Sequence, residues 1–354
     1  MLYQTKNQHG GDVYGGGITL DFSANTNPLG TPPGVLEAVC RALPRLHRYP
    51  DPYCRRLVQA IAGHEQVPAS YILCGNGAAD LIYTYCAALR PRTAVELAPT
   101  FVEYGAGLAQ VGCRVERYFL HQAQNFDLDE RFLSFLEEKK PEVVFLCNPN
   151  NPTGRLIPLP LLEQILQYCA AQGARLFLDE CFLDLTEDGV SAKSLLAAHP
   201  ELLILKAFTK SYGMAGIRLG YCLCADNALL RRMAAASPPW NVSSPAQSAG
   251  VAALAERDFL QRTLSLVRTE RRWLTDNLTV LGFWVCPSHA NYLLFRGPLG
   301  LREGLLQQGI AIRGCGNYNG LGDGWYRIAV RPHGENEALI TAIRQFCKEK
   351  SLWQ

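Results

Sequence analysis

The chain has 354 residues, 48% of them hydrophobic and 19% charged, and its 34 Lys and Arg nearly balance its 32 Asp and Glu. The resulting net charge of +2 provides no strong field for nucleic acid or a membrane surface, so a small molecule is the expected partner. No segment approaches the roughly 18 consecutive apolar residues of a membrane span, and the length predicts two domains.

The cysteines, thirteen in all, are scattered along the chain. Their closest pair, Cys222 and Cys224, has neither the spacing of a CxxC metal site nor the regularity of a disulfide framework. Residues 1–17 are polar and glycine-rich and lack the apolar core of a signal peptide. These features predict a soluble cytoplasmic protein with reduced thiols in its core and no metal site.

Apolar, strand-like runs alternate with segments of helical period from about residue 71 to residue 224. Strands are expected at 71–74, 94–98, 143–147, 176–178 and 202–205, and helices at 79–89 and 161–171. Continuous apolar strands with helices between them predict an α/β fold with a mainly parallel sheet covered on both faces. In such sheets, ligand-binding residues collect at the carboxyl ends of the strands. Glycine, asparagine, acid and lysine follow those ends here, at 75–77, 148–152, 179–180 and 208–210.

A second, smaller α+β unit is expected after the Pro238-Pro239-Trp240 interruption. It contains a long helical stretch around 246–281, alternating segments at 291–295 and 325–330, and a last helix at about 335–348. The segment 28–43 is expected to pack with it. We therefore predict three parts: residues 1–45 as an N-terminal arm and small-domain segment, 46–245 as the large domain, and 246–354 as the small C-terminal domain.

Lys210 follows the apolar run 202–205 within a turn of small residues. A lysine in a desolvated position becomes a nucleophile that forms a Schiff base with a carbonyl cofactor, whereas the alternative is a solvated surface lysine. Asp179 ends another apolar run, where a buried carboxylate needs a cation or strong donors. A protonated pyridine nitrogen would supply that cation. In the alternative, Asp179 and Glu180 cap a helix.

A glycine-rich turn at 75–80 follows one expected strand and opens a helix. The free backbone N–H groups of Gly77, Ala78 and Ala79 and the positive helix end could hold a phosphate. The turn lacks the ending of a Walker loop and the third glycine of a dinucleotide fingerprint. Arg218 could add a bidentate phosphate contact, or else form a salt bridge within the sheet.

The most specific stretch is NPNNPTG at residues 148–154, for which a plain Pro/Asn turn is the alternative. Together with Asp179 and Lys210 it resembles the fold-type-I pyridoxal-phosphate (PLP) enzymes of the aminotransferase superfamily, and the likeness covers nearly the whole chain. The resemblance implies a large PLP-binding domain, built on a mainly parallel sheet covered by helices, and a smaller α+β domain. It also implies that Lys210 forms the Schiff base with PLP and that Asp179 pairs with the pyridinium nitrogen.

The same resemblance implies the other cofactor contacts. Asn151 would hydrogen-bond the ring hydroxyl, and Phe101 would stack on the ring. The phosphate would be held by Gly77, Ala78, Ala79, Thr209 and Arg218. Tyr49 would reach the phosphate of the neighbouring subunit's cofactor, which implies a homodimer with its sites at the interface. Ala207 stands where these enzymes commonly carry a serine or threonine, and the loss of that hydrogen bond weakens cofactor binding by about 1 kcal/mol.

Two branches of the superfamily act on phosphorylated amines and share the most motifs with the chain. They are the histidinol-phosphate aminotransferases and the L-threonine-O-3-phosphate decarboxylases of cobalamin synthesis. Phe182 stands where the aminotransferases usually have tyrosine. Further segments look like the decarboxylases, at 9–11, 21–25, 27–30, 238–242, 313–318 and 327–331. This resemblance implies that the phosphate and carboxylate of the substrate are bound by His9, Asn25, Arg327 and Arg331. A disordered tail is the alternative for His9, and a solvated strand arginine for Arg327.

The expected reaction is therefore decarboxylation of L-threonine O-3-phosphate to (R)-1-amino-2-propanol phosphate. Transamination of the histidinol-phosphate type is the alternative, because the motifs common to both branches do not decide which bond at Cα breaks. A non-catalytic PLP-binding protein is the alternative of another class, and the intact set of Lys210, Asp179, Asn151 and Arg218 argues against it.

Overall fold

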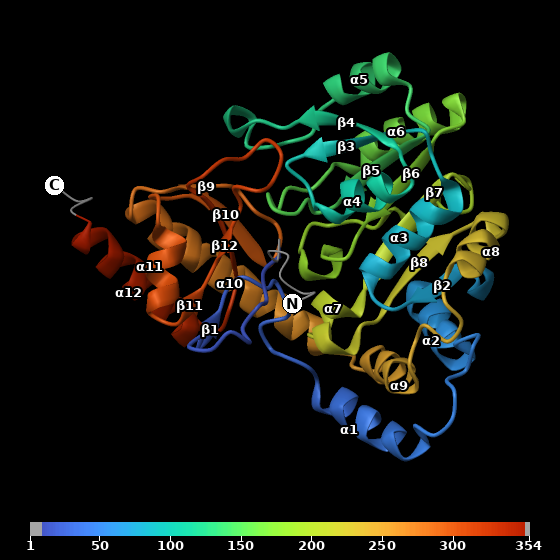
Figure 1. The fold of residues 1–354 in the computed structure, drawn as a ribbon, viewed down its shortest axis with the longest axis horizontal. Helices are drawn as coiled ribbons and strands as arrows, with labels where there is room; N and C mark the ends of the chain where they lie inside the picture. Colours follow the sequence, from blue (N-terminus) through green and yellow to red (C-terminus); the bar gives the residue numbers. More distant parts are fainter. Residues whose placement is uncertain (1–8, 351–354) are drawn as a thin grey trace.

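The larger sheet of the protein has seven strands in the order β2-β8-β7-β6-β5-β3-β4 (Figure 1). The structure is a computed structural model that describes residues 9–350. In this sheet β8 runs antiparallel to both neighbours and the other pairs are parallel, so the mainly parallel sheet is confirmed. The strands are β2 (Ile72–Gly75), β3 (Thr93–Ala98), β4 (Arg114–Phe119), β5 (Val143–Cys147), β6 (Arg175–Asp179), β7 (Leu202–Ala207) and β8 (Gly220–Cys224).

Both faces of this sheet are covered by helices, as the continuous apolar strands predict. Along β5, Val144 and Leu146 belong to one buried cluster, whereas Val143 and Phe145 belong to another, because successive strand side chains point to opposite faces. The covering helices are α2 (Arg55–Glu65), α3 (Ala78–Leu89), α4 (Glu103–Gln110), α5 (Arg131–Lys139), α6 (Leu159–Gln172) and α8 (Asn227–Ala236).

A second, antiparallel sheet follows in the C-terminal part, with the order β12-β13-β10-β9. The elements of this part are β9 (Trp284–Val285), β10 (Tyr292–Arg296), α11 (Leu301–Gln307), β11 (Ile310–Ala311), β12 (Arg313–Gly314), β13 (Trp325–Ala329) and α12 (His333–Glu349). Strand β1 (Leu20–Asp21) of the N-terminal arm pairs in parallel with β11. The arm therefore joins the C-terminal unit and crosses the space between the two sheets.

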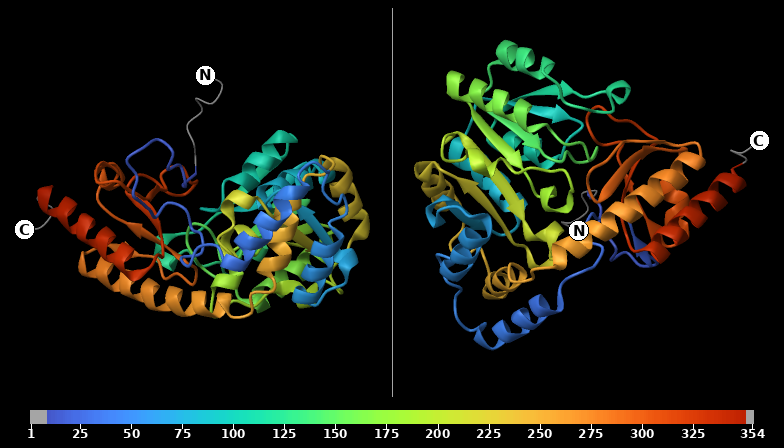
Figure 2. Two further views of the ribbon diagram at one scale, coloured as in Figure 1. Left: turned by 90° about the horizontal axis from the view of Figure 1, so that it is seen from below. Right: turned by 180° about the vertical axis from the view of Figure 1, so that it is seen from behind.

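The structure adds detail to two expectations about helices. The stretch 246–281 forms two helices, α9 (Ser244–Ala253) and α10 (Phe259–Val280), and only α10 reaches the second sheet (Figure 2). Helix α1 (Pro33–Ala42) packs against α9, which lies almost entirely within the predicted C-terminal part, residues 246–354 (Figure 1). Gly250 of α9 also permits close packing against α2, because a Cβ there would lie 2.6 Å from the Leu57 side chain. The three-part division at 45 and 245 stays a prediction.

None of the helices formed by residues 9–350 is long and apolar enough to cross a membrane.

Candidate active site

The carboxyl ends of four neighbouring strands meet around one cavity of about 400 Å³. Lys210 reaches it from α7 (Phe208–Ser211), a single helical turn that directly follows β7. Asp179 is the last residue of β6, and the loop after β5 brings Asn151. The predicted site residues that line the cavity are His9, Asn25, Ala78, Ala79, Phe101, Asn151, Asp179, Thr209, Lys210, Arg218 and Arg327. Most of the residues predicted from distant motifs therefore share one space.

Lys210 is half-buried and lines this cavity, and its amine lies 5.4 Å from the centre of the Phe182 ring. Burial lowers the pKa of the Lys210 amine to about 8, and the positive charge of Arg327 adds to the shift. A lysine with this pKa is partly uncharged near neutral pH, which is the form that attacks a carbonyl carbon. The alternative of a solvated surface lysine is thereby removed.

Asp179 presents a buried carboxylate to the same cavity. Its Oδ2 accepts a hydrogen bond from the Tyr104 hydroxyl (2.6 Å), and its Oδ1 accepts one from the Cys181 N–H (2.9 Å). Burial nevertheless raises the pKa of Asp179. A cationic group in the cavity would restore the ionised form, because an opposite charge within a few ångströms favours it.

Glu180 has a different task from its neighbour. Its side chain accepts hydrogen bonds from the Ser191 hydroxyl (2.6 Å) and from the Ala192 N–H (2.9 Å) at the start of a short 3₁₀ helix, residues 192–195. Burial raises the pKa of Glu180 to about 7. The helix-capping alternative therefore applies to Glu180 and not to Asp179.

A phosphate-sized anion site lies at the start of α3. Gly77 precedes the helix with φ of +84°, and a Cβ there would lie 2.6 Å from Nη2 of Arg218. Glycine is thus required both by the backbone and by the guanidinium. The first N–H groups of α3, from Ala78 and Ala79, and the Arg218 side chain are donors at this end of the cavity. Arg218 donates to the Ala215 carbonyl (3.3 Å), and no salt bridge within the sheet holds it among residues 9–350.

The NPNNPTG loop and the loop that carries Phe101 are tied together. Asn150 donates to the Pro99 carbonyl (3.0 Å) and accepts from the Thr100 hydroxyl (2.8 Å). Its own carbonyl accepts from the Tyr292 hydroxyl of β10 (2.9 Å). This network of hydrogen bonds places Phe101 and Asn151 in the wall of one cavity.

The end of the cavity near the second sheet is cationic and polar. Arg327 of β13 is only 6% exposed, which removes the alternative of a solvated arginine. Its guanidinium donates to Oδ1 of Asn151 and to the Ser23 carbonyl (2.9 Å). Asn25 is 1% exposed, and within residues 9–350 both polar atoms of its side chain lack a hydrogen-bond partner. Because an unpaired buried amide is costly, Asn25 is suited to a polar ligand.

Ten lining residues were not among the predicted site residues, and they include Glu103, Cys181, Arg313 and Tyr318. Arg313 and Tyr318 belong to the segment 313–318, whose likeness to the decarboxylases was the available signal. No sequence pattern indicated Glu103, because its role depends on a contact with a residue 94 positions away.

Three predicted residues do not line the cavity: Gly77, Tyr49 and Arg331. Gly77 nevertheless lies directly beside the lining residue Arg218. Arg331 pairs instead with Glu335 (2.8 Å), because Pro332 is the N-cap of α12 and sets these residues about one helical turn apart. The assignment of Arg331 to the substrate therefore stays a prediction. Tyr49 is 78% exposed and stacks on the Trp240 ring with centroids 4.4 Å apart.

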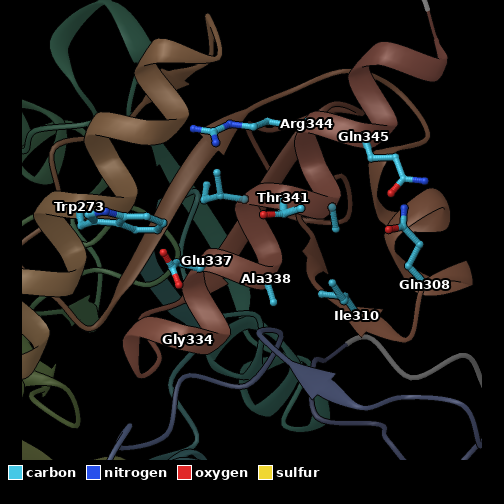
Figure 3. A pocket seen from close by; sticks show the side chains of 11 residues that line it. Trp273, Gln308, Ile310, Gly334, Glu337, Ala338, Thr341, Arg344 and Gln345 are labelled. Atoms are coloured by element: carbon cyan, nitrogen blue, oxygen red, sulfur yellow. The ribbon is translucent and has the colours of Figure 1, made fainter.

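The cavity provides the donor set that PLP requires. It combines a lysine amine, a buried carboxylate whose pKa is raised by burial, an aromatic ring and an anion site at a helix start. Another hollow, of about 570 Å³, lies between α10 and α12 and is lined by Trp273, Glu337 and Arg344 among others (Figure 3). It shares no lining residue with the Lys210 cavity and contains no lysine or histidine, so it lacks a nucleophile for this chemistry.

Comparisons with known proteins agree with this site. Residues 18–346 match the family "Aminotransferase class I and II". The chain is 41% identical to a threonine-phosphate decarboxylase of Salmonella typhimurium, over 92% of this chain and 90% of the relative. It is 33% identical to a histidinol-phosphate aminotransferase of Geobacillus sp., over 96% and 93%. The crystal structure of the histidinol-phosphate aminotransferase from Clostridium acetobutylicum superposes with a TM-score of 0.87 at 28% identity, covering 93% of this chain and 99% of that one. The chain belongs to the aminotransferase class I and II family.

Proposed function

We propose that this PLP-dependent enzyme decarboxylates L-threonine O-3-phosphate to (R)-1-amino-2-propanol phosphate, a step of cobalamin biosynthesis. The observation that carries the proposal is the 41% identity to a threonine-phosphate decarboxylase over 92% of the chain. The identity to the histidinol-phosphate aminotransferase of Geobacillus is lower, at 33%. The cavity supports the phosphorylated substrate class, since it contains cationic side chains beyond those needed for PLP.

The residues that would hold PLP follow from the cavity. Lys210 would bind its aldehyde carbon, Asp179 would pair with its ring nitrogen, and Asn151 would donate to its hydroxyl. Phe101 would lie against the ring. The phosphate would be bound by Gly77, Ala78, Ala79, Thr209 and Arg218. When bound, PLP withdraws electrons from the substrate Cα, so that a bond at this carbon can break heterolytically.

Side chains of the enzyme then decide which bond breaks. Arg327 would orient the substrate through its carboxylate or phosphate, with Asn25 and His9 completing the anion contacts. These side chains would favour cleavage of one bond at Cα by the way they orient the substrate, and a bias of about 1.4 kcal/mol in this orientation would change the rate ratio roughly tenfold. Once the carboxylate has left as CO₂, the amine of Lys210 would deliver the proton to Cα.

Transamination is the second candidate, because several relatives are histidinol-phosphate aminotransferases. The test is incubation of the PLP-loaded protein with L-threonine O-3-phosphate, with and without 2-oxoglutarate, while CO₂ release is followed. Release that is independent of 2-oxoglutarate is expected. Absence of CO₂, together with glutamate formation from histidinol phosphate and 2-oxoglutarate, would replace the decarboxylase by the aminotransferase.

A homodimer is part of the proposal. Several large apolar side chains between residues 36 and 53 are exposed: Leu36, Leu43, Leu46, Tyr49 and Tyr53. Trp240, which stacks on Tyr49, is exposed as well. A partner subunit would cover them and receive Tyr49 at its cofactor phosphate. Sedimentation should give a dimer, and Tyr49→Ala should weaken PLP binding. The free state of all thirteen cysteines supports a cytoplasmic location.

Replacement of Arg327 should raise KM strongly. In Arg327→Lys the planar two-pronged donor is lost, so KM for the phosphorylated substrate should rise about 10- to 100-fold. Arg331→Ala is the matched control, because Arg331 pairs with Glu335 outside the cavity, and its KM should stay within about twofold. Steady-state kinetics distinguish the two. An equal rise in both variants would mean that Arg331 also binds substrate.

The reactivity of Lys210 should follow its lowered pKa. Below the pKa the amine is protonated and cannot attack, so PLP capture by the cofactor-free protein should accelerate as pH rises. The midpoint should lie near 8 rather than near the ordinary value of 10.5. Stopped-flow absorbance at a series of pH values measures this rate. A midpoint close to 10.5 would show that neither burial nor Arg327 acts on the amine.

A further inference from the structure

Glu103 is a carboxylate in the wall of a cavity proposed to receive an anionic substrate. A lone carboxylate there would repel the substrate. Both of its oxygens are engaged, however: Oε1 accepts from Nε2 of His9 (2.6 Å), and Oε2 accepts from the Tyr83 hydroxyl (2.6 Å). The contact with His9 is the main cause that lowers the pKa of Glu103. The negative charge of Glu103 is thus stabilised by its hydrogen bond with His9.

The His9 ring is held at the mouth of the cavity from two sides. On the ring side it lies 5.9 Å from Phe101, centroid to centroid, next to Glu103 on α4. On the backbone side, the Gly11 N–H donates to the Ser23 hydroxyl (2.8 Å), and the Ser23 carbonyl accepts from Arg327. His9 is therefore fixed relative to the arginine proposed to bind substrate.

The hydrogen bond between Glu103 and His9 links the N-terminal arm to the larger sheet. The arm that carries His9 pairs with β11 of the C-terminal unit, whereas Glu103 begins α4 beside the larger sheet. The pair Glu103–His9 therefore draws the arm over the cavity. Within the arm, Gly10 lies close to Ser23, and only glycine fits there because a Cβ would lie 2.2 Å from the Ser23 carbonyl oxygen.

We propose that Glu103 is a positioning residue for substrate binding: with Tyr83 behind it, Glu103 holds the imidazole of His9 over the cavity, where the imidazole contacts the phosphate of the substrate. This inference rests on the proposed function, because it requires a phosphorylated substrate. Glu103 and Tyr83 therefore affect substrate binding, which KM reports, and take no part in breaking the bond at Cα.

The experiment is a double-mutant cycle of Glu103→Gln and His9→Ala in the PLP-loaded enzyme. Glu103→Gln should raise KM for the phosphorylated amine about tenfold, with kcat and the visible absorbance of bound PLP unchanged. In the His9→Ala background, Glu103→Gln should have no further effect. Tyr83→Phe should raise KM in the same direction but less. Glu137→Gln, on an exposed face of α5, is the control for removal of one acidic charge.

A purely structural role predicts something else. Glu103 lies in the first turn of α4, where a carboxylate also stabilises the helix end. If that were its only role, Glu103→Gln would lower the unfolding temperature and leave KM unchanged, or its effect on KM would persist in the His9→Ala background. Either result overturns the proposal. Failure of the proposed function would be seen separately, as absence of CO₂ release from L-threonine O-3-phosphate by the wild-type enzyme. The double-mutant cycle can then be repeated with histidinol phosphate and 2-oxoglutarate as substrates.

Discussion

Lys210→Ala should abolish turnover, with a loss of about 10⁴-fold or more in kcat. Lys210 has two proposed tasks, covalent attachment of PLP and protonation of the substrate at Cα, and alanine can perform neither. The variant should also lose the visible absorbance band of the bound cofactor. Lys210 is half-buried and forms no hydrogen bond to an acid within residues 9–350, so the fold should tolerate alanine, and thermal unfolding checks this.

Lys348→Ala is the matched control, since Lys348 lies exposed on α12 and far from the cavity lining. It should retain both the absorbance band and the activity. Should Lys210→Ala keep the band, another amine would hold the cofactor, and the site described above would not be the catalytic one.

Asp179→Asn should reduce kcat about 10²- to 10³-fold while the protein still folds and binds PLP. The neutral amide cannot balance a protonated ring nitrogen, so the ring would withdraw electrons less strongly when the bond at Cα breaks. Since burial already raises the pKa of Asp179, replacing the carboxylate by an amide costs the cofactor-free fold little. The measurement is kcat under saturating substrate, with the unfolding temperature of the cofactor-free protein.

Tyr104→Phe separates charge from orientation at this position. It removes the hydrogen bond from the Tyr104 hydroxyl to Asp179 and leaves the carboxylate in place. One lost hydrogen bond to a charged group is worth about 1.5 kcal/mol, so the expected loss is roughly tenfold. If Tyr104→Phe were as damaging as Asp179→Asn, the position of the carboxylate and not its charge would be the decisive property.

Much of the cofactor site was predictable because its parts are short and local. Each predicted strand ends at a recognisable residue type, and parallel strands bring their carboxyl ends to one edge of the sheet. For this reason Asp179, Asn151 and Lys210 were expected to meet, and the cavity contains all three. The turn around Gly77 and Arg218 were expected to share one phosphate, and the structure brings their atoms close together.

The substrate end was less predictable, because its residues come from irregular segments. Arg331 continues the motif of β13, yet Pro332 turns the chain into α12 and pairs the guanidinium with Glu335. Arg327, four residues earlier, lies on the strand and reaches the cavity. The direction of a side chain at the end of a strand depends on the element that follows. The sequence motif alone does not specify this direction.

The sequence by itself determined the alternation of strands and helices and the identity of the reactive groups, since hydrophobic period and residue chemistry are local properties. The tertiary structure decided the rest: where the arm runs, that α1 packs on α9, and that His9 meets Glu103 across 94 residues of chain. Such contacts are selected by the packing of whole elements around two sheets. No local pattern specifies them, because their energy arises only when distant segments are brought together.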